Sequence, residues 1–434
     1  MRMLKRYYRI YLSKLLLLTI MQLNLSFAQD GGSVYGFVTD SSNGEALIGA
    51  NVFINELGLG MATDVNGYYV LQDIDPGEYD ITVSYVGYKI LIRKVTINGD
   101  DAIKLDLVLV EELVTFDEVE VTAEKIKRKN NIQPSMVNLS PRMLRAAPAL
   151  AEPDLFRTIQ ALPGVLTTSE FSTGLVIRGG NTDQNLILLD GVTVYNPSHL
   201  GGIFSNFIVD GVKEAELIKG AYNAEYGGRL SAVLNIISRE GNKKKIEGKA
   251  NLSLLSAQAT LEGPFYKGAW VFSGRRTYFD KIFQNVPSIP PYYFYDIQSH
   301  IYSDLTPKDR LSLSFYNGVD DLLFETFGLS GRWGNNTLSA QYRRVFSEKL
   351  IANFLYANSL FFTEFGLGGS AGLNSDNQID DATVAANFSW FKTSKSTVKF
   401  GAQLKNLGFL YTNTFGDSLQ FKIETKPKEF ASYA

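Results

Sequence analysis

The chain alternates apolar and polar side chains over long stretches, and this period of two constrains its fold most strongly. In the C-terminal part, Leu311, Leu313 and Phe315 are separated by serines, and the same alternation recurs up to residue 404. Alternation of this kind gives a β-strand one apolar and one polar face. We therefore expect a mainly β protein in which residues 246–434 form antiparallel strands with two unlike faces.

Helices are excluded as the means of crossing a membrane beyond residue 28. No stretch there approaches the ~18 consecutive apolar residues that indicate a transmembrane helix. Because lipid offers no hydrogen bonds to the backbone, the remaining spanning structure is a closed β-barrel. A soluble β-domain with one solvated face is the alternative. Aromatic groups typical of interfacial belts favour the barrel: Phe315-Tyr316, Phe361-Phe362, Trp390-Phe391 and Phe409-Leu410-Tyr411.

Residues 1–28 have the pattern of a secretory signal peptide. Basic residues precede an apolar run, Leu15 to Leu25, and Ser26-Phe27-Ala28 ends in a small residue. Gln22 and Asn24 interrupt the run, which disfavours a membrane anchor. We expect an exported protein of a Gram-negative cell, cleaved after the signal.

The composition excludes several classes of function. Lys and Arg number 42 against 45 Asp and Glu, so no basic field points to nucleic acid. There is no Cys, which excludes disulfides and thiolate metal sites. The two His residues, His199 and His300, have neither zinc-ligand spacing nor a nucleophile elbow nearby. We therefore expect no enzyme activity, no cofactor and no metal.

Residues 33–110 contain short alternating runs separated by turns such as Asn43-Gly44 and Asp75-Pro76-Gly77. Such spacing predicts a small β-sandwich. The segment resembles the carboxypeptidase regulatory-like domain, a transthyretin-like sandwich, in Val34-Tyr35-Gly36-Phe37-Val38, Gly49-Ala50-Asn51-Val52 and Thr63-Asp64-Val65-Asn66-Gly67. The resemblance implies an accessory fold without peptidase activity.

Residues 111–131 change from acidic to basic, as an exposed linker would. Within it, Val119 to Thr122 alternates apolar and polar side chains, the pattern of an extended strand that can add to another protein's sheet. A last sandwich strand and a plain linker are the alternatives. The predicted docking strand comprises Glu118, Val119, Glu120, Val121, Thr122 and Ala123.

Residues 132–241 read as a glycine-rich α/β unit. A short helix is expected between Pro153 and Pro163, and the unbroken run Leu186 to Leu189 predicts a strand buried on both faces. The segment resembles the plug domain of TonB-dependent outer-membrane receptors in Leu162-Pro163-Gly164-Val165, Ile177-Arg178-Gly179-Gly180, Leu189-Asp190-Gly191-Val192 and Glu225-Tyr226-Gly227-Gly228-Arg229. The docking strand is similar to the box by which such receptors contact TonB.

The resemblance implies a plug inside a 22-stranded barrel, remodelled by TonB and its inner-membrane energising complex. Because such a plug must leave the lumen, its contacts with the barrel wall should be polar. Arg178, Glu225 and Arg229 are candidates for these contacts, and pairing within the plug is the equal alternative. Residues 246–434 suffice for roughly eight to ten strands of ordinary length. We therefore expect that the sequence holds only part of the barrel.

The expected function is TonB-driven import of a scarce nutrient across the outer membrane, of the ferric siderophore, cobalamin or glycan class. A non-transporting adhesion or scaffold protein is the alternative. Expected partners are TonB, outer-membrane lipid and an unknown small-molecule or glycan ligand. Ile177-Arg178-Gly179-Gly180 with Asp183-Gln184 departs from receptors that pair with a surface lipoprotein, so such a partner is not favoured. Pro290 to Tyr295 is expected in an interfacial belt rather than a ligand-gripping loop.

Overall fold

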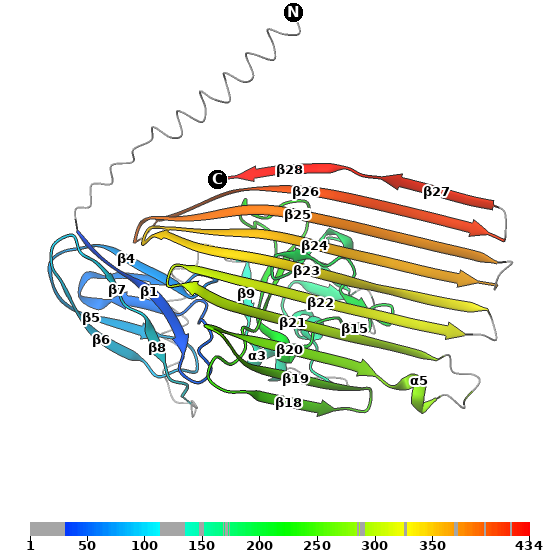
Figure 1. Ribbon diagram of the computed structural model, residues 1–434, viewed down its shortest axis with the longest axis horizontal. Helices are drawn as coiled ribbons and strands as arrows, with labels where there is room; N and C mark the ends of the chain where they lie inside the picture. The colour runs from blue at the N-terminus through cyan, green and yellow to red at the C-terminus, as the bar shows by residue number, and fades with distance from the viewer. Residues whose placement is uncertain are drawn as a thin grey trace, which may run out of the picture.

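Three β-rich units follow one another along the chain in the computed structural model (Figure 1). It describes residues 31–112, 135–146, 152–167, 169, 172, 174–283, 286, 291–324, 328–368, 372–394, 396–416 and 419–434. None of the helices in these ranges is both long and apolar enough to span a membrane.

The first unit is a sandwich of two four-stranded sheets. In one sheet β1 (Gly32–Asp40) pairs with β4 (Tyr68–Ile74), β7 (Ala102–Lys104) and β8 (Leu107–Leu109). The other runs in the order β3 (Leu59–Ala62), β2 (Asn51–Ile54), β5 (Gly77–Ser84) and β6 (Leu91–Ile97), with η1 (Asn55–Leu57) between β2 and β3. Alternate residues such as Val34, Val52 and Ile81 fill a common core between the sheets.

The second unit has a five-stranded mixed sheet in the order β13 (Val192–Thr193), β12 (Leu186–Leu189), β17 (Val233–Ser238), β16 (Val212–Ile218) and β9 (Met136–Leu139). Strand β12 lies between two neighbours and is largely buried, as its apolar run predicts. The smaller elements around the sheet are α3 (Pro141–Ala146), α4 (Leu155–Gln160), η2 (Thr182–Gln184), η3 (Val209–Gly211), and the hairpins β10 (Val165–Thr167) with β11 (Leu175–Ile177) and β14 (Ser198–His199) with β15 (Phe204–Ser205).

Helix α4 shows how the sequence sets the local structure of this unit. Its N-cap Asp154 accepts hydrogen bonds from the backbone N–H groups of Phe156 and Arg157, at 2.8 and 3.0 Å. Leu155, Phe156 and Ile159 then face the core of the sheet. The second carboxylate oxygen of Asp154 accepts from Ser205 N at 2.7 Å, so the cap also fixes the β14–β15 hairpin.

The third unit is an eleven-stranded antiparallel sheet whose strands follow chain order. Its strands are β18 (Glu247–Leu252), β19 (Ser256–Phe265), β20 (Gly268–Thr277), β21 (Tyr292–Thr306), β22 (Asp309–Phe324), β23 (Leu329–Ser347), β24 (Leu350–Leu367), β25 (Leu373–Thr393), β26 (Ser396–Phe415), β27 (Leu419–Thr425) and β28 (Lys428–Tyr433), with α5 (Phe279–Ile282) after β20. Strands β27 and β28 pair with β26 one after the other, because Pro427 between them cannot donate to the ladder.

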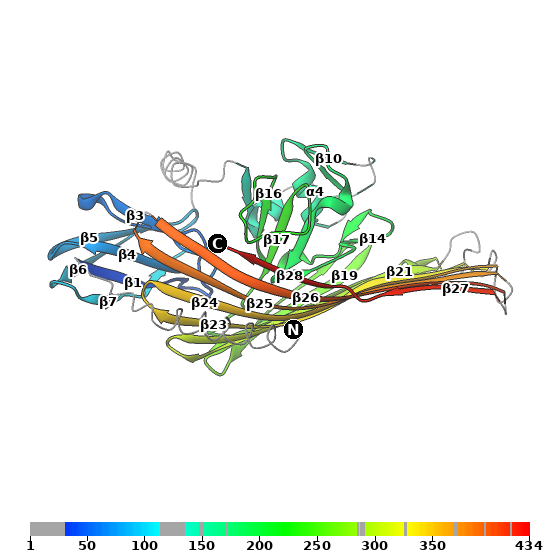
Figure 2. The same cartoon turned by 90° about the horizontal axis from the view of Figure 1, so that it is seen from above.

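The strands of this sheet are longer than the alternation predicted. Strands β24, β25 and β26 have 18, 21 and 20 residues, whereas about 9–11 residues suffice to cross a bilayer. The sandwich lies at one end of the sheet (Figures 1 and 2). The second unit, called the plug unit for the domain it resembles, lies against the concave face of the sheet, which is called the wall (Figure 2). The long strands therefore continue past the plug at the end remote from the sandwich.

Two of the predicted belt aromatics are placed differently by the structure. Tyr316 is fully buried, and its hydroxyl donates to Asp296 at 2.8 Å on the concave face. Phe391 is 4 % exposed and packs against Tyr68 of the sandwich, with ring centroids 5.7 Å apart. The prediction was wrong for these two residues, because adjacent residues of a strand point to opposite faces and only one of each pair can face outward.

Candidate functional site

The contact between the plug unit and the large sheet is centred on His199. This residue is fully buried at the β14–β15 hairpin. Its Nδ1 lies 2.6 Å from Asp320 Oδ2, and its Nε2 lies 2.8 Å from Asp296 Oδ1. Since carboxylates only accept hydrogen bonds, both ring nitrogens must carry a proton. The geometry therefore calls for a positively charged imidazolium between two strands of the sheet.

The electrostatics of the site agree with this protonation state. Burial lowers the pKa of His199, but the charges and hydrogen bonds of Asp296 and Asp320 outweigh it and raise the pKa to about 9. The ring also stacks on Phe294, with centroids 4.1 Å apart and planes inclined by 9°. The plug thus presents a cation to the wall at neutral pH.

Arg275 on β20 joins the same network from the wall. Its Nη2 donates to Asp296 Oδ2 at 2.6 Å and to the carbonyl of Ser205 at 2.7 Å. Its Nη1 donates to Glu152 Oε1 of the plug unit at 2.6 Å. Every one of these side chains is at most 5 % exposed. We call Glu152, His199, Arg275, Asp296 and Asp320 the latch.

Aromatic hydroxyls complete the latch. Tyr292 donates to Asp320, and Tyr316 donates to Asp296. Tyr292 and Phe294 are 7 % and 1 % exposed and face the plug hairpin, so the prediction of an interfacial belt at Pro290 to Tyr295 was wrong for these two residues. Buried charges of both signs, together with the apolar cluster of Phe204, Tyr292 and Phe294, hold the plug unit to the wall here.

A second charged junction surrounds the connector between the plug unit and the sheet. Arg239 binds Glu262 of β19 through two hydrogen bonds of 3.0 and 2.6 Å and lies 3.4 Å from Glu45 of the sandwich. The Glu45 carboxylate also accepts from Gly241 N at 2.9 Å. Gly241 has φ +87°, and a Cβ there would lie 2.3 Å from the carbonyl oxygen of Trp270. Only glycine fits this turn without a clash, and Glu45 of the sandwich holds the turn through its hydrogen bond with Gly241.

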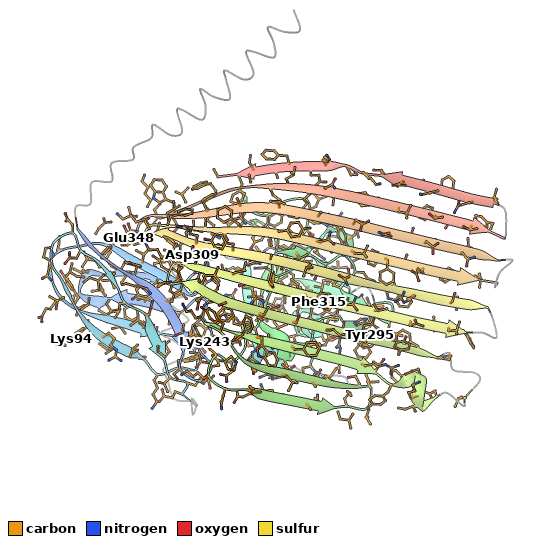
Figure 3. The ribbon with its side chains drawn as sticks, in the orientation of Figure 1. Lys94, Lys243, Tyr295, Asp309, Phe315 and Glu348 are labelled. Atoms are coloured by element: carbon orange, nitrogen blue, oxygen red, sulfur yellow. The ribbon has the colours of Figure 1, made fainter. Side chains whose placement is uncertain are left out.

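The sandwich also packs on two turns at the near end of the large sheet, the one between β23 and β24 and the one between β25 and β26. Tyr68 and Val70 of β4 pack against Val345, Ile351 and Phe391. The Tyr68 hydroxyl donates to the carbonyl of Glu348 at 2.7 Å, in the turn labelled in Figure 3. The contact is therefore apolar at its centre.

Backbone-like hydrogen bonds flank that apolar contact. Gln72 N donates to Ser394 Oγ at 2.8 Å, and Ser394 Oγ donates back to the Gln72 carbonyl at 2.7 Å. The Gln72 side-chain amide donates to the carbonyl of Phe391 at 2.8 Å. These bonds fix the register of β4 against the turn between β25 and β26.

The structure places the three predicted plug contacts at different partners. Glu225 accepts from Lys399 of β26 at 2.8 and 3.1 Å, across the plug–wall boundary. Arg178 donates to Ser135 at 2.9 Å within the plug unit, and Arg229 donates to the carbonyl of Gly228 at 2.9 Å. The predicted docking strand, residues 118–123, lies outside the described residues.

Sequence reasoning did not single out the latch. From the sequence His199 was excluded only as a zinc ligand or catalytic residue, and its acidic partners come from strands more than 90 residues away. A usable signal was nevertheless present: Asp296, Gln298 and His300 occupy alternate positions of one strand and must share a face.

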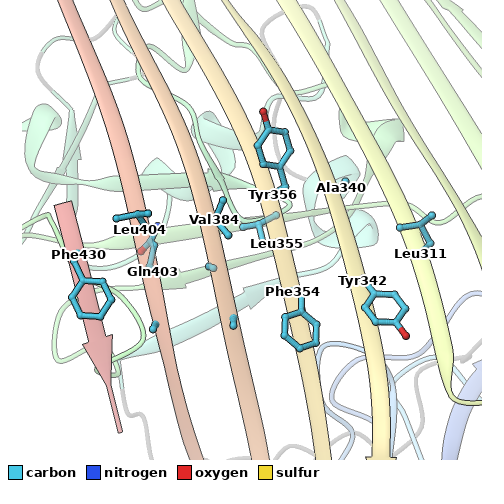
Figure 4. Close-up of a pocket in the computed structure, with 13 residues that line it drawn as sticks. Leu311, Ala340, Tyr342, Phe354, Leu355, Tyr356, Val384, Gln403, Leu404 and Phe430 are labelled. Carbon is cyan, nitrogen blue, oxygen red and sulfur yellow. The ribbon is translucent and has the colours of Figure 1, made fainter. Parts of the chain in front are cut away.

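The opposite face of the large sheet is apolar at the level of the plug. A shallow groove there is lined by Leu311, Tyr342, Phe354, Tyr356, Leu404 and Phe430, with alanines at its floor (Figure 4). Leu313, Leu338 and Val384 are exposed nearby, whereas the concave face at this level carries buried Thr337, Ser339 and Thr383. Apolar-out and polar-in is the pattern of a membrane β-barrel wall.

Comparison with known families identifies the first two units. Residues 34–121 match the model of the CarboxypepD_reg-like domain, and residues 119–233 match the model of the TonB-dependent receptor plug domain. The two matches meet at the predicted docking strand.

Characterised relatives are also TonB-dependent receptors. A TonB-dependent receptor of Formosa agariphila is 30 % identical over 233 residues, which is 49 % of this chain and 22 % of the relative. The TonB-dependent receptor SusC of Bacteroides thetaiotaomicron is 28 % identical over 246 residues, 54 % of this chain and 24 % of the relative. The alignments thus span less than a quarter of each relative.

Solved structures share the fold. The chain resembles P. aeruginosa FpvA bound to heterologous pyoverdines, with a TM-score of 0.53 and 12 % identity over 70 % of this chain and 49 % of that one. It also resembles the copper transporter OprC, with a TM-score of 0.51 and 12 % identity over 69 % of this chain and 51 % of that one. The chain thus carries a carboxypeptidase regulatory-like domain followed by a TonB-dependent receptor plug domain, and it is similar to TonB-dependent receptors over part of their length.

Proposed function

We propose that this protein imports a scarce nutrient across the outer membrane by TonB-driven displacement of its plug, and that it catalyses no reaction. The latch carries the proposal. A plug that only filled a hole would be held most simply by apolar packing, whereas this one is held to the wall by five buried charged groups. Charges of this kind can exchange their partners for water when the lumen hydrates.

TonB is the proposed partner, and residues 118–123 are its proposed contact. Downstream of this segment the described plug begins at Ser135 and β9, an edge strand that pairs only with β16. An edge strand reached first by a pull can be peeled from its sheet without breaking the sheet's interior. Arg178 donates a hydrogen bond to Ser135 beside this edge strand, so this hydrogen bond should be the first to break when the strand is pulled away.

Plug displacement can be tested by the accessibility of a buried wall position. Ser359 is 1 % exposed, and its hydroxyl donates to the carbonyl of Thr193 in the plug at 2.7 Å. Since residues 1–434 contain no Cys, Ser359→Cys introduces a thiol into this part of the protein, and labelling is measured against the unsubstituted full-length receptor. In cells producing the full-length receptor, we expect maleimide labelling of this thiol to require TonB and to stop when residues 118–123 are deleted.

A matched control is Glu364→Cys on the same strand, which is exposed and should label equally in every background. Labelling of Ser359→Cys that persists unchanged after deletion of residues 118–123 would refute the docking assignment. Absence of any TonB-dependent labelling would favour a non-transporting adhesion or scaffold protein.

A further inference from the structure

The turn that follows β1 in the sandwich lies on the segment that joins the plug unit to the large sheet. We call residues 40–46 the sandwich turn and residues 239–246, between the end of β17 and the start of β18, the connector. The sandwich turn is shaped by its own residues. Glu45 N donates to Asn43 Oδ1 at 2.7 Å, and Gly44 between them has φ +83°. The turn therefore meets the connector as a preformed element.

Hydrogen bonds join the sandwich turn to the connector at several points. The backbone N–H of Lys243, labelled in Figure 3, donates to the carbonyl of Asn43 at 2.8 Å. Ala46 N of the sandwich donates to Glu240 Oε2 at 3.4 Å. These bonds add to the one that Gly241 N donates to the sandwich. A connector that moved away from the turn would leave backbone donors without their acceptors.

Ion pairs hold the connector to the plug unit and to the large sheet as well. The Glu240 carboxylate lies 3.1 Å from Lys213 Nζ of β16 and 3.3 Å from Arg310 Nη1 of β22. Lys243 Nζ lies 3.1 Å from Asp304 of β21. The side chains around Glu240 are largely buried, so salt screens these attractions little. The connector is therefore held on one side by the sandwich turn and on the other by the sheet.

The last strand of the plug unit runs directly into the connector. Strand β17 lies in the middle of the plug sheet, whereas β9 is one of its edges. At the end of β17, Ser238 Oγ accepts a hydrogen bond from Gln298 Nε2 of the wall at 2.9 Å. The same nitrogen donates to the carbonyl of Gly211 at 3.3 Å. The C-terminal end of the plug unit thus contacts the wall beside the connector.

We propose that the sandwich is a clamp, which holds the connector on the large sheet so that the end of β17 stays in place while the rest of the plug moves. The proposal rests on the TonB-driven displacement proposed above. Residues 118–123 lie between the sandwich and the plug in sequence, so a pull on them loads both units.

The two units resist such a pull unequally. The sandwich is held by its apolar contact with the turns of the sheet and by its hydrogen bonds to the connector. The plug offers the edge strand β9, which can separate from β16 without disturbing the middle of the sheet. The edge therefore yields first, and the clamped end of β17 remains as a fixed point from which the plug can return.

The test compares two thiols in the wall of the full-length receptor, in cells with and without TonB. Ser359→Cys faces Thr193 of the plug, and Gln298→Cys faces Ser238 at the clamped end. Maleimide labelling of each is measured against the unsubstituted receptor and divided by its labelling after unfolding. We expect TonB to raise the labelling of Ser359→Cys and to leave that of Gln298→Cys at its level without TonB.

The remaining outcomes separate two failures. Equal TonB-dependent labelling of both thiols would show that the plug leaves as one body, which would overturn the clamp and leave the displacement standing. No TonB-dependent labelling of either thiol would refute the displacement on which the clamp rests.

Substitutions assign the protection to the sandwich. Glu45→Ala removes the acceptor of Gly241 N, so the TonB-dependent labelling of Gln298→Cys should rise to that of Ser359→Cys. Glu45→Gln keeps an acceptor oxygen and should give a smaller rise. Glu56→Ala, on the exposed η1 of the same sandwich, is the matched control and should change neither thiol.

Low labelling of both thiols without TonB verifies that each variant is folded. Protection of Gln298→Cys that persists in folded Glu45→Ala would show that the contacts between plug and wall, and not the sandwich, hold the end of β17.

Discussion

The wall of the large sheet makes two unlike contacts, one with the plug and one with the sandwich. The plug is held by the latch, whose members are charged and buried. The sandwich is held on the near-end turns by Tyr68, Val70 and Phe391 with backbone hydrogen bonds around them. Apolar contacts separate only at the cost of exposing their surface to water, whereas ions regain hydration when they part. The difference is what we expect if the plug leaves the wall during import, as we propose, while the sandwich remains on it.

The largest effect is expected from removing Arg275, the cation that the wall contributes to the latch. Arg275→Met leaves Asp296 and Glu152 buried without this partner. Removing one partner of a buried ion pair lowers the free energy of unfolding by about 3–5 kcal/mol. The Ser359→Cys thiol should then label without TonB. Hydrogen exchange of the plug provides a second measurement, and protection equal to that of the unsubstituted protein would contradict the role of the latch.

A somewhat smaller loss is expected at the sandwich contact. Tyr68→Ala removes a large buried ring, which costs about 3 kcal/mol in a well-packed site. It should release the sandwich to limited proteolysis without raising the labelling of Ser359→Cys. A rise in that labelling would show that the two contacts are not independent.

A disulfide tests whether the sandwich stays in place. Gln72 and Ser394 are joined by two hydrogen bonds, so Gln72→Cys with Ser394→Cys should crosslink in isolated outer membranes and shift the unreduced protein on a gel. TonB-dependent labelling of Ser359→Cys should survive this crosslink once the crosslinked pair has formed. Lys94→Cys with Ser394→Cys is the control, because Lys94 lies on the far side of the sandwich (Figure 3).

The latch should also depend on pH through His199. Its pKa is raised to about 9 in the folded protein, so the attraction is complete below the unfolded value near 6.5 and is lost as the pH rises through about 9. The thiol itself ionises at about pH 8.5, so labelling of Ser359→Cys is divided by that of the exposed Glu364→Cys, and this ratio should increase between about pH 8 and pH 10. In His199→Gln the ratio should be higher at neutral pH and flat over this range, and a parallel increase in both proteins would assign the titration to another group.

The smallest effect is expected at the exposed plug contact. Glu225 pairs with Lys399, whose side chain is 45 % exposed, and such pairs contribute about 0.2–1 kcal/mol. Glu225→Gln should change Ser359→Cys labelling little, and salt should remove the difference. An effect as large as that of Arg275→Met would place the principal lock at this pair.

The sequence predicted much of the fold because period-two alternation and turn residues are local signals. The strands at β1, β12 and β16 follow from apolar runs, and the glycine motifs identified the plug. Strands β3 and β6 have weak local signals, since Leu59–Ala62 contains a glycine and Leu91–Ile97 has mostly exposed side chains. Their pairing is decided by neighbours far along the chain.

The contacts of the latch could not be predicted from local sequence signals, for a related physical reason. Its charges become partners only when a hairpin of the plug meets three strands of the wall, and nothing near His199 in sequence announces Asp296 or Asp320. Glu225 pairs with Lys399 of the wall because it lies in an exposed loop, whereas Arg178 and Arg229 bond to residues of the plug unit itself.

The outward-facing side chains of the long strands are apolar at the level of the plug and charged beyond it, which also fixes how deep the receptor can sit. Sliding the wall inward by one pair of residues would carry Arg332 and Glu364 toward hydrocarbon, at about 0–1 kcal/mol for a basic residue near the interface and more at greater depth. Sliding it outward would lift Leu313 and Val384 into water. The outward-facing residues of the strands thus set how deeply the sheet lies in the bilayer. Since the sandwich packs on the turns at one end of these strands, the same residues set its distance from the bilayer.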